Sequence, residues 1–252
     1  MAKRILIGLA GLVPAIAPSA CSAMGQVMPA DEMVVEQVPV ALDKHRVVIL
    51  TDMEADPDDT QSLIRLLLYS NEIDIEALVA TTSIWKKKDI RPDSIRTTLG
   101  KYGEVYDTLS QHAPDYPAES ELQDLVMSGQ PGYGMASVGT GQSTEGSDAI
   151  IRLLEAEDDR PLWISVWGGA NTLAQALHDI REKKSETEAA RLISKLRVYT
   201  ISDQDDSGIW MRREFPSLAR AMKPKPGSDS EWSAPRLSPD LQRVRRAMEA
   251  HL

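Results

Sequence analysis

The sequence predicts an α/β protein built on an open, mainly parallel, doubly wound sheet with helices on both faces. Four short apolar runs are rich in β-branched residues, which is typical of strands buried on both faces. Segments of helical periodicity lie between these runs, as in repeated strand–helix–strand units. The chain has 252 residues, of which 42% are hydrophobic, and this is enough for one core of ordinary size.

The predicted elements alternate along the chain. Strands are expected at residues 46–50, 75–83, 161–169 and 196–206. Helices are expected at residues 59–70, 93–110, 147–157, 171–184 and 185–196. In the third helix Ser147 is a natural N-cap. Residues 111–146 are rich in Pro, Gly, Ser and Gln, and they are interpreted either as a long excursion that covers a site or as a disordered insertion.

The N-terminus has the pattern of a secretory signal peptide over residues 1–23. Lys3 and Arg4 precede an apolar stretch, and small residues follow it. The localisation expected is secreted or periplasmic, and a lipid anchor at Cys21, the single cysteine, is the alternative. Residues 24–45 are interpreted as a linker, 46–220 as the α/β domain and 221–252 as an irregular or helical tail.

The formal net charge is −10. An acidic protein repels the phosphate backbone, so no nucleic-acid partner is expected. The basic run 86–88 is too short to change this and is interpreted as a solvated loop. The Pro-interrupted apolar stretch of the signal peptide is too short to span a membrane.

An unusual acidic cluster follows the first predicted strand. Five carboxylates fall within eight positions: Asp52, Glu54, Asp56, Asp58 and Asp59. Like charges this close raise one another's pKa, and a hard divalent cation with oxygen ligands would relieve the repulsion. Ca²⁺ is the expected ion and Mg²⁺ the second choice. The alternative is helix capping, which accounts for Asp58 or Asp59 but not for the others.

Ligands of open parallel sheets bind beyond the carboxyl ends of the strands, and polar or aromatic residues follow each predicted strand. Trp85 follows the second strand, a Gly-Gly-Ala-Asn turn ending at Asn171 follows the third, and Asp205 follows the fourth. Trp167 and Trp210 lie at or after strand ends as well. Aromatic faces at the rim of a polar cleft suit sugars or bases, so Trp85 and Trp210 are expected to contact a ligand, with core packing as the alternative.

The motif Asp52-x-Glu54-x-x-x-Asp58-Asp59 resembles the Asp-x-Asp-x-x-x-Asp-Asp signature of the nucleoside hydrolases. The segments "IDIEALVATTS" (73–83) and "VWGGANTLAQAL" (166–177) resemble the second strand and the Gly-rich turn of that family. "TTSIW" and "ISDQDDSGIWMRREFP" (201–216) are similar to its secreted branch of cellulose-binding proteins with a nucleoside-hydrolase-like domain. The resemblance covers roughly residues 46–220.

This resemblance implies a Ca²⁺-dependent hydrolase of N-glycosidic bonds in ribosides or related glycosides. By position, Asp59 would be a bidentate calcium ligand, and Glu54 a ligand that also takes a proton from the attacking water. Asp58 would hold sugar hydroxyls, while Asp52 would support the metal site and the main-chain carbonyl of Asn171 would complete it. Asn171, Asp205, Trp85 and Trp210 are expected near the substrate, a small glycoside or a polysaccharide.

The sequence also departs from the family pattern in three places. Glu54 stands where the family has Asp, and Trp85 with Lys86 replaces a polar residue after the second strand. No counterpart is recognised for the last metal-binding Asp. Asp240 is the one late candidate, in a setting typical of a helix cap, so the chain is either truncated or divergent, or Asp205 substitutes. These departures favour the alternative function, a non-catalytic carbohydrate-binding protein on the same fold.

Overall fold

The computed structural model describes residues 43–219, which lie in the second of the two units into which the chain divides, Met1–Leu42 and Asp43–Leu252. The predicted signal peptide, Cys21, most of the predicted linker and the tail after 221, with Asp240, lie outside the described residues. The linker prediction ran to residue 45, whereas the first strand already begins at His45.

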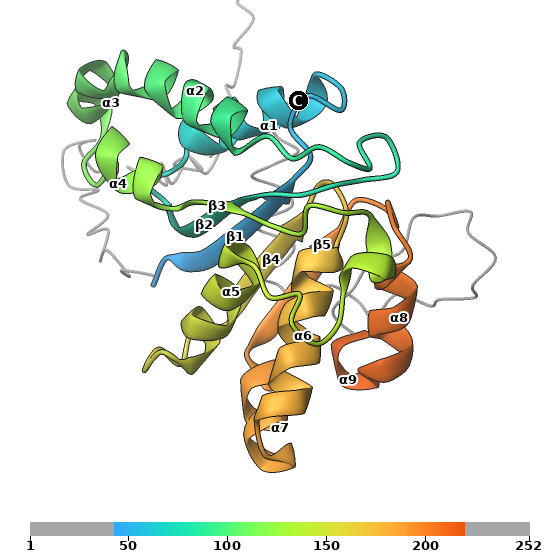
Figure 1. Ribbon diagram of the computed structural model, residues 1–252. Coiled ribbons are helices and arrows are strands. Elements are labelled where there is room, and N and C mark those ends of the chain that lie inside the picture. The colour runs from blue at the N-terminus through green and yellow to red at the C-terminus, as the bar shows by residue number, and fades with distance from the viewer. Residues whose placement is uncertain (1–42, 220–252) are drawn as a thin grey trace, which may run out of the picture. The chain divides into compact units, whose positions relative to one another are not determined.

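The fold is a five-stranded, all-parallel sheet with the order β3-β2-β1-β4-β5 (Figure 1). This confirms the predicted α/β class and its parallel sheet. The strands are β1 (His45–Thr51), β2 (Ile73–Ala80), β3 (Val126–Ser128), β4 (Leu162–Val166) and β5 (Leu196–Thr200). The three-residue strand β3 was missed, because it lies in the Pro- and Gly-rich stretch 111–146 that was interpreted as an excursion or a disordered insertion.

Helices connect the strands close to where the periodicity places them. They are α1 (Asp58–Leu67), α2 (Pro92–Gly103), α3 (Tyr106–His112), α4 (Glu119–Asp124), α5 (Glu145–Glu155), α6 (Asn171–Lys183), α7 (Glu186–Ser194), α8 (Ser207–Glu214) and α9 (Pro216–Ala219), with a 3₁₀ turn η2 (Gly134–Ser137). The helix predicted over 93–110 is divided into α2 and α3 just after Gly103.

The N-cap prediction for α5 was wrong by one helical turn. Thr144 is the N-cap, and its hydroxyl accepts a hydrogen bond from the Ser147 amide. Ser147 is the N3 residue, and its own hydroxyl oxygen accepts the Thr144 amide hydrogen at 2.8 Å. Either residue type fits an N-cap, and this reciprocal pair is the capping-box arrangement that places the cap at Thr144.

Two apolar clusters cover the two faces of the sheet, as expected for a doubly wound fold. Val48, Val79 and Ile164 pack on one face with buried residues of α5, α6 and α7. Ile49 and Leu78 pack on the other face with buried residues of α1 and α2. The sheet is thereby fixed from both sides, so the loops at its carboxyl edge start from rigid positions.

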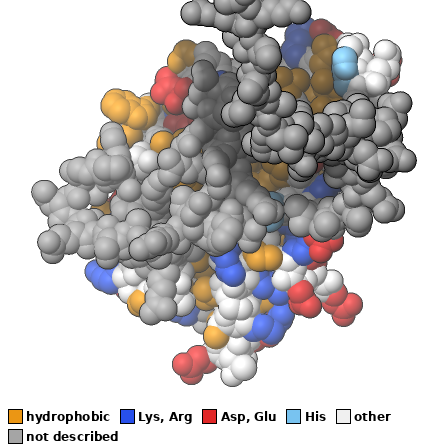
Figure 2. All heavy atoms as spheres, turned by 180° about the vertical axis from the view of Figure 1, so that it is seen from behind, with side chains coloured by type: hydrophobic (Ala, Val, Ile, Leu, Met, Phe, Trp, Pro, Cys, Tyr) orange, Lys and Arg blue, Asp and Glu red, His pale blue; other side chains and the backbone are white. Residues whose placement is uncertain are grey.

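The surface of the described region is charged and mixed. Seen from behind, basic and acidic side chains lie next to one another over the lower part of the molecule (Figure 2). None of the helices between residues 43 and 219 has the length and hydropathy needed to cross a bilayer.

Candidate functional site

The loops that follow β1, β2 and β4 are joined by backbone hydrogen bonds at the carboxyl edge of the sheet. The Thr81 amide donates to the Thr51 carbonyl at 2.8 Å, and the Gly169 amide donates to the Thr82 carbonyl at 2.8 Å. Gly169 allows this approach, since a Cβ there would lie 2.5 Å from the Thr82 carbonyl oxygen and 2.6 Å from a carboxylate oxygen of Asp205. The expected convergence of site residues at this edge is therefore built into the backbone.

Asp52 and Asp59 form a buried carboxyl pair at the end of β1. One carboxylate oxygen of Asp59 accepts the Thr51 hydroxyl hydrogen and, at 3.0 Å, the Asp52 amide hydrogen. Burial raises the pKa of Asp59 to about 7, and the neighbouring carboxyls of Asp52 and Asp58 add to the rise. The Asp59 carboxyl thus accepts two hydrogen bonds, and its pKa lies close to neutral pH.

Asp58 lies on the exposed side of the same turn, in the first turn of α1. A hydrogen bond with the Asp56 side chain raises the pKa of Asp58, and partial burial raises it further. The Asp58 amide donates to Asp56 at 3.1 Å. Neither Asp58 nor Asp59 is the N-cap of α1, which is Pro57, but both lie in the first turn of the helix.

Glu54 is turned to a different set of partners. Its carboxylate accepts hydrogen bonds from Arg91 and from the Ser94 hydroxyl, both at 2.5 Å, and Lys86 lies 3.9 Å away. Its backbone has a φ of 69°, in the left-handed region that costs a non-glycine residue about 1 kcal/mol or more. Arg91 and Ser94 were not singled out from the sequence, because they lie 37 and 40 residues further along the chain.

The carboxylates that were predicted to bind calcium have different partners in the structure. Residues 43–219 contain no group of three or more His, Cys, Asp or Glu side chains arranged to hold a metal ion. Asp52 and Asp59 have the required chemistry and lie together, but Glu54 is occupied by Arg91 and Ser94. The calcium site stays a prediction.

Asn171 and Asp205 meet at the start of α6. Asn171 is fully buried, and its backbone amide donates to an Asp205 carboxylate oxygen at 3.2 Å. The other Asp205 oxygen accepts hydrogen bonds from the amide and hydroxyl of Ser207. Burial raises the pKa of Asp205 despite these donors. The Asn171 side-chain oxygen is buried without a hydrogen-bond partner, so this corner contains an unused acceptor.

Trp85 is presented on a tight turn after β2. Ser83 and Lys86 exchange two backbone hydrogen bonds of 3.0 and 3.2 Å, and the buried Ser83 hydroxyl accepts the Trp85 amide hydrogen at 3.1 Å. The Trp85 side chain is 75% exposed. The ring is therefore accessible from solvent on a turn whose backbone is fixed by hydrogen bonds.

The other tryptophans lie in different surroundings. Trp167 is buried in the cluster on the α1 and α2 side of the sheet, and its indole N–H donates to Ser165 at 3.0 Å. Trp210 is half-buried on α8, where it packs edge-to-face with Phe215 and stacks with Arg181. No contact joins Trp210 to the acidic turn within the described residues, and its expected ligand contact stays a prediction.

Tyr133 is a candidate residue that the sequence analysis did not name. Its ring lies 4.8 Å from the ammonium nitrogen of Lys87, two residues after Trp85. Burial raises the pKa of the Tyr133 phenol, and the charges of Asp205 and Asp206 add to the rise. The available signal was an aromatic residue between two glycines in "PGYGM", which is typical of a tightly turned, specific loop.

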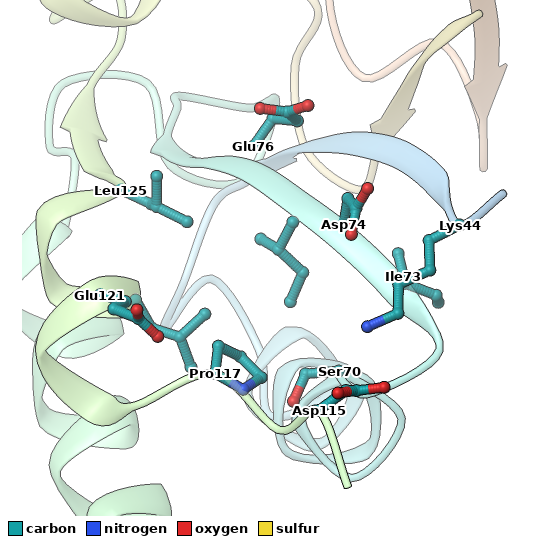
Figure 3. A pocket seen from close by; sticks show the side chains of 11 residues that line it. Lys44, Ser70, Ile73, Asp74, Glu76, Asp115, Pro117, Glu121 and Leu125 are labelled. Carbon is teal, nitrogen blue, oxygen red and sulfur yellow. The ribbon is translucent and has the colours of Figure 1, made fainter. Parts of the chain in front are cut away.

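A separate hollow of about 340 Å³ lies at the opposite, amino end of β2 (Figure 3). Two of its acids are already paired, Asp74 with Arg160 at 2.6 Å and Glu76 with Arg46 at 2.5 Å. None of the predicted site residues lines it. The candidate site is therefore the carboxyl edge of the sheet and not this hollow.

The all-parallel sheet and the acidic turn after its first strand define a nucleoside-hydrolase-like α/β protein. The chain belongs to the family described as "Cellulose-binding Sde182, nucleoside hydrolase-like domain", which matches residues 46–242. Among curated proteins none matches this chain.

One solved structure resembles the chain with a TM-score of 0.68 and 42% sequence identity. It is a nucleoside hydrolase-related hypothetical protein from Saccharophagus degradans, described as associated with carbohydrate metabolism. The match covers 69% of this chain and 43% of that chain, so this chain spans less than half the length of the relative. Both findings agree with the family and fold predicted from the sequence.

Proposed function

We propose that this protein binds a glucan of the cellulose type at the carboxyl edge of its sheet and does not hydrolyse it. The observation that carries the proposal is Trp85, whose ring is 75% exposed on a turn fastened by Ser83. The apolar face of a pyranose ring stacks on an aromatic face, and a fixed ring loses little conformational entropy on binding. The family description, which names cellulose, supports this ligand class.

The surroundings of Glu54 support binding without hydrolysis. The family resemblance gives this position two roles, as a metal ligand and as a base. Here the carboxylate forms ion pairs with Arg91 and Lys86 and accepts a hydrogen bond from the Ser94 hydroxyl. Lys86 belongs to the Trp85 turn, so Glu54 acts as an anchor of the binding loop.

The test is a binding isotherm on insoluble cellulose with EDTA present throughout. The variants are Trp85→Ala and, as a matched control, Tyr199→Ala, which removes an aromatic ring that is 41% exposed on β5. We expect the unmodified protein and the control to bind alike and Trp85→Ala to lose roughly tenfold or more in affinity, as for a central aromatic anchor. Equal binding by all three proteins, or binding by none, would contradict the proposal.

A second candidate function is calcium-dependent hydrolysis of an N-glycosidic bond in a riboside or related glycoside. The buried Asp52–Asp59 pair favours it, because burial and the adjacent carboxyl raise the pKa of Asp59 to about 7, and perturbed carboxyls are typical of reaction centres. Hydrolysis of p-nitrophenyl riboside is measured with calcium and with EDTA. Turnover that requires calcium and disappears in Asp59→Asn would favour this function over simple binding.

A further inference from the structure

The loop around Tyr133 is fastened on both sides to the candidate site. The Gly132 carbonyl accepts hydrogen bonds from the Asn171 side-chain amide at 2.7 Å and the Thr82 hydroxyl at 3.2 Å. On the other side, the Met135 amide donates to an Asp206 carboxylate oxygen at 2.8 Å. The backbone of Tyr133 is thus fixed between two anchored residues.

Gly134 makes this conformation accessible to the chain. Its φ of +61° lies in the left-handed region, and a Cβ at this position would clash with the Asp206 carboxylate. The turn that presents Tyr133 therefore depends on a glycine, on Asp206 and on Asn171. This is the construction expected of a loop with a specific role and not of a disordered insertion.

Lys87 joins this loop to the turn that carries Trp85. Its ammonium nitrogen lies 4.8 Å from the centre of the Tyr133 ring, within the range of a cation–π contact. Trp85 and Tyr133 therefore lie on separate segments that contact each other through Lys87 and through the hydrogen bond from Thr82 to Gly132. Each aromatic ring offers roughly the area of one sugar ring.

The charges around Tyr133 restrict the class of ligand. Burial and the nearby Asp205 and Asp206 carboxylates raise the pKa of its phenol, so the hydroxyl stays protonated and is available as a hydrogen-bond donor. Asp56 and Asp58 are exposed at the adjacent turn after β1. The Lys87 ammonium lies against the same ring, so charges of both signs surround Tyr133, and these surroundings suit a neutral, hydroxyl-rich chain better than a charged one.

From these contacts we infer that Tyr133 and Lys87 form a second sugar subsite beside Trp85, so that the site takes a neutral oligosaccharide and not a single sugar or nucleoside. This inference rests on the proposed function, because Trp85 supplies the first subsite. A ligand with several linked rings contacts both aromatic residues at once, and the second contact is then intramolecular, which raises the overall affinity.

The test is isothermal titration calorimetry of the full chain in EDTA with cellobiose, cellohexaose and hexagalacturonate. We expect cellohexaose to bind the unmodified protein roughly tenfold more tightly than cellobiose, and hexagalacturonate to bind more weakly than cellohexaose. Tyr133→Ala should lose most of the advantage of cellohexaose, while Tyr133→Phe keeps the ring and most of the affinity. Tyr199→Ala is the matched aromatic control, and thermal unfolding checks each variant.

The outcomes separate the two proposals. Failure of the unmodified protein to bind cellohexaose, or full binding by Trp85→Ala, overturns the proposed function. Loss of binding in Trp85→Ala with full cellohexaose affinity in Tyr133→Ala overturns the second subsite alone, as does equal affinity for hexagalacturonate. If Tyr133→Ala fails to fold, Lys87→Ala, a change at an exposed residue, replaces it, and unchanged cellohexaose affinity in that variant also overturns the subsite.

Discussion

The Arg91 guanidinium holds the Glu54 carboxylate at 2.5 Å. Ser94 donates a second hydrogen bond to the same carboxylate, and Arg91 is itself paired with Asp93 at 2.8 Å. The acidic turn therefore contains a buried carboxyl pair, Asp52 and Asp59, and an exposed carboxylate, Glu54, which is bound to Arg91 and Ser94.

The backbone of Glu54 leads to a prediction for stability. With a φ of 69°, the position favours glycine, whereas alanine keeps the steric strain. Glu54→Gly should therefore be more stable than Glu54→Ala by about 1 kcal/mol, although both lose the ion pair with Arg91. Urea denaturation measures the free energy of unfolding of both variants, and a more stable alanine variant would refute the strain at this position.

Release of Glu54 should change the affinity for calcium. In the double variant Arg91→Ala/Ser94→Ala the Glu54 carboxylate loses the two donors that hold it, and it becomes available beside Asp52 and Asp59. Calorimetric titration with calcium chloride should give roughly tenfold or tighter binding in the double variant than in the unmodified protein. Tight calcium binding by the unmodified protein, unchanged in the variant, would instead show that Arg91 and Ser94 do not keep the Glu54 carboxylate from binding calcium.

The pKa of Asp59 predicts a pH dependence of stability. In the unfolded chain this carboxyl has a pKa near 3.8, and burial raises it to about 7 in the folded protein. The folded state binds the proton more tightly, so stability falls as the pH rises from about 4 to about 7, by on the order of 2–4 kcal/mol.

Asp59→Asn removes this titration while its amide oxygen still accepts from Thr51 and the Asp52 amide. Denaturation between pH 4 and pH 8, in EDTA, should show the fall in the unmodified protein and a flatter profile in the variant. Parallel profiles for the two proteins would contradict the assignment to Asp59.

Asp205 should be far more important for stability than its neighbour Asp203. Asp205 is buried and joins the starts of α6 and α8 through Asn171 and Ser207. Asp205→Ala leaves these buried donors unpaired, which should cost roughly 2–5 kcal/mol. Asp203 forms an ion pair with Arg212 nearer the surface, at 2.6 Å, so Asp203→Ala should cost less than about 1 kcal/mol. Comparable losses in urea denaturation would contradict this difference.

The sequence predicted most of the sheet because β1, β2, β4 and β5 each contain several apolar or β-branched residues in a short segment. The helices between them show the periodicity of an amphipathic helix. β3 has three residues and depends on pairing with β2 at Leu78–Ala80. Such a strand is stabilised by its neighbour, so the local sequence carries little signal for it.

The sequence predicted the site residues that lie directly after strands. It did not predict contacts between residues that are far apart in the chain. Strand ends placed Asp52, Asp59, Asn171 and Trp85 at one edge, as a parallel sheet requires. The orientation of Glu54 could not be predicted, because its donors belong to α2 and the preceding loop. Tyr133 was missed for the same reason, since its contact with Lys87 crosses 46 positions of sequence and appears only in the fold.

The most direct test of carbohydrate binding through Trp85 is the indole N–H resonance of that residue during titration with cellohexaose. The protein contains five tryptophans, and Trp85→Phe assigns the signal. We expect the Trp85 resonance to shift and saturate with ligand, while the resonances of Trp163 and buried Trp167 stay in place. A stationary Trp85 signal at ligand concentrations that saturate binding would contradict it.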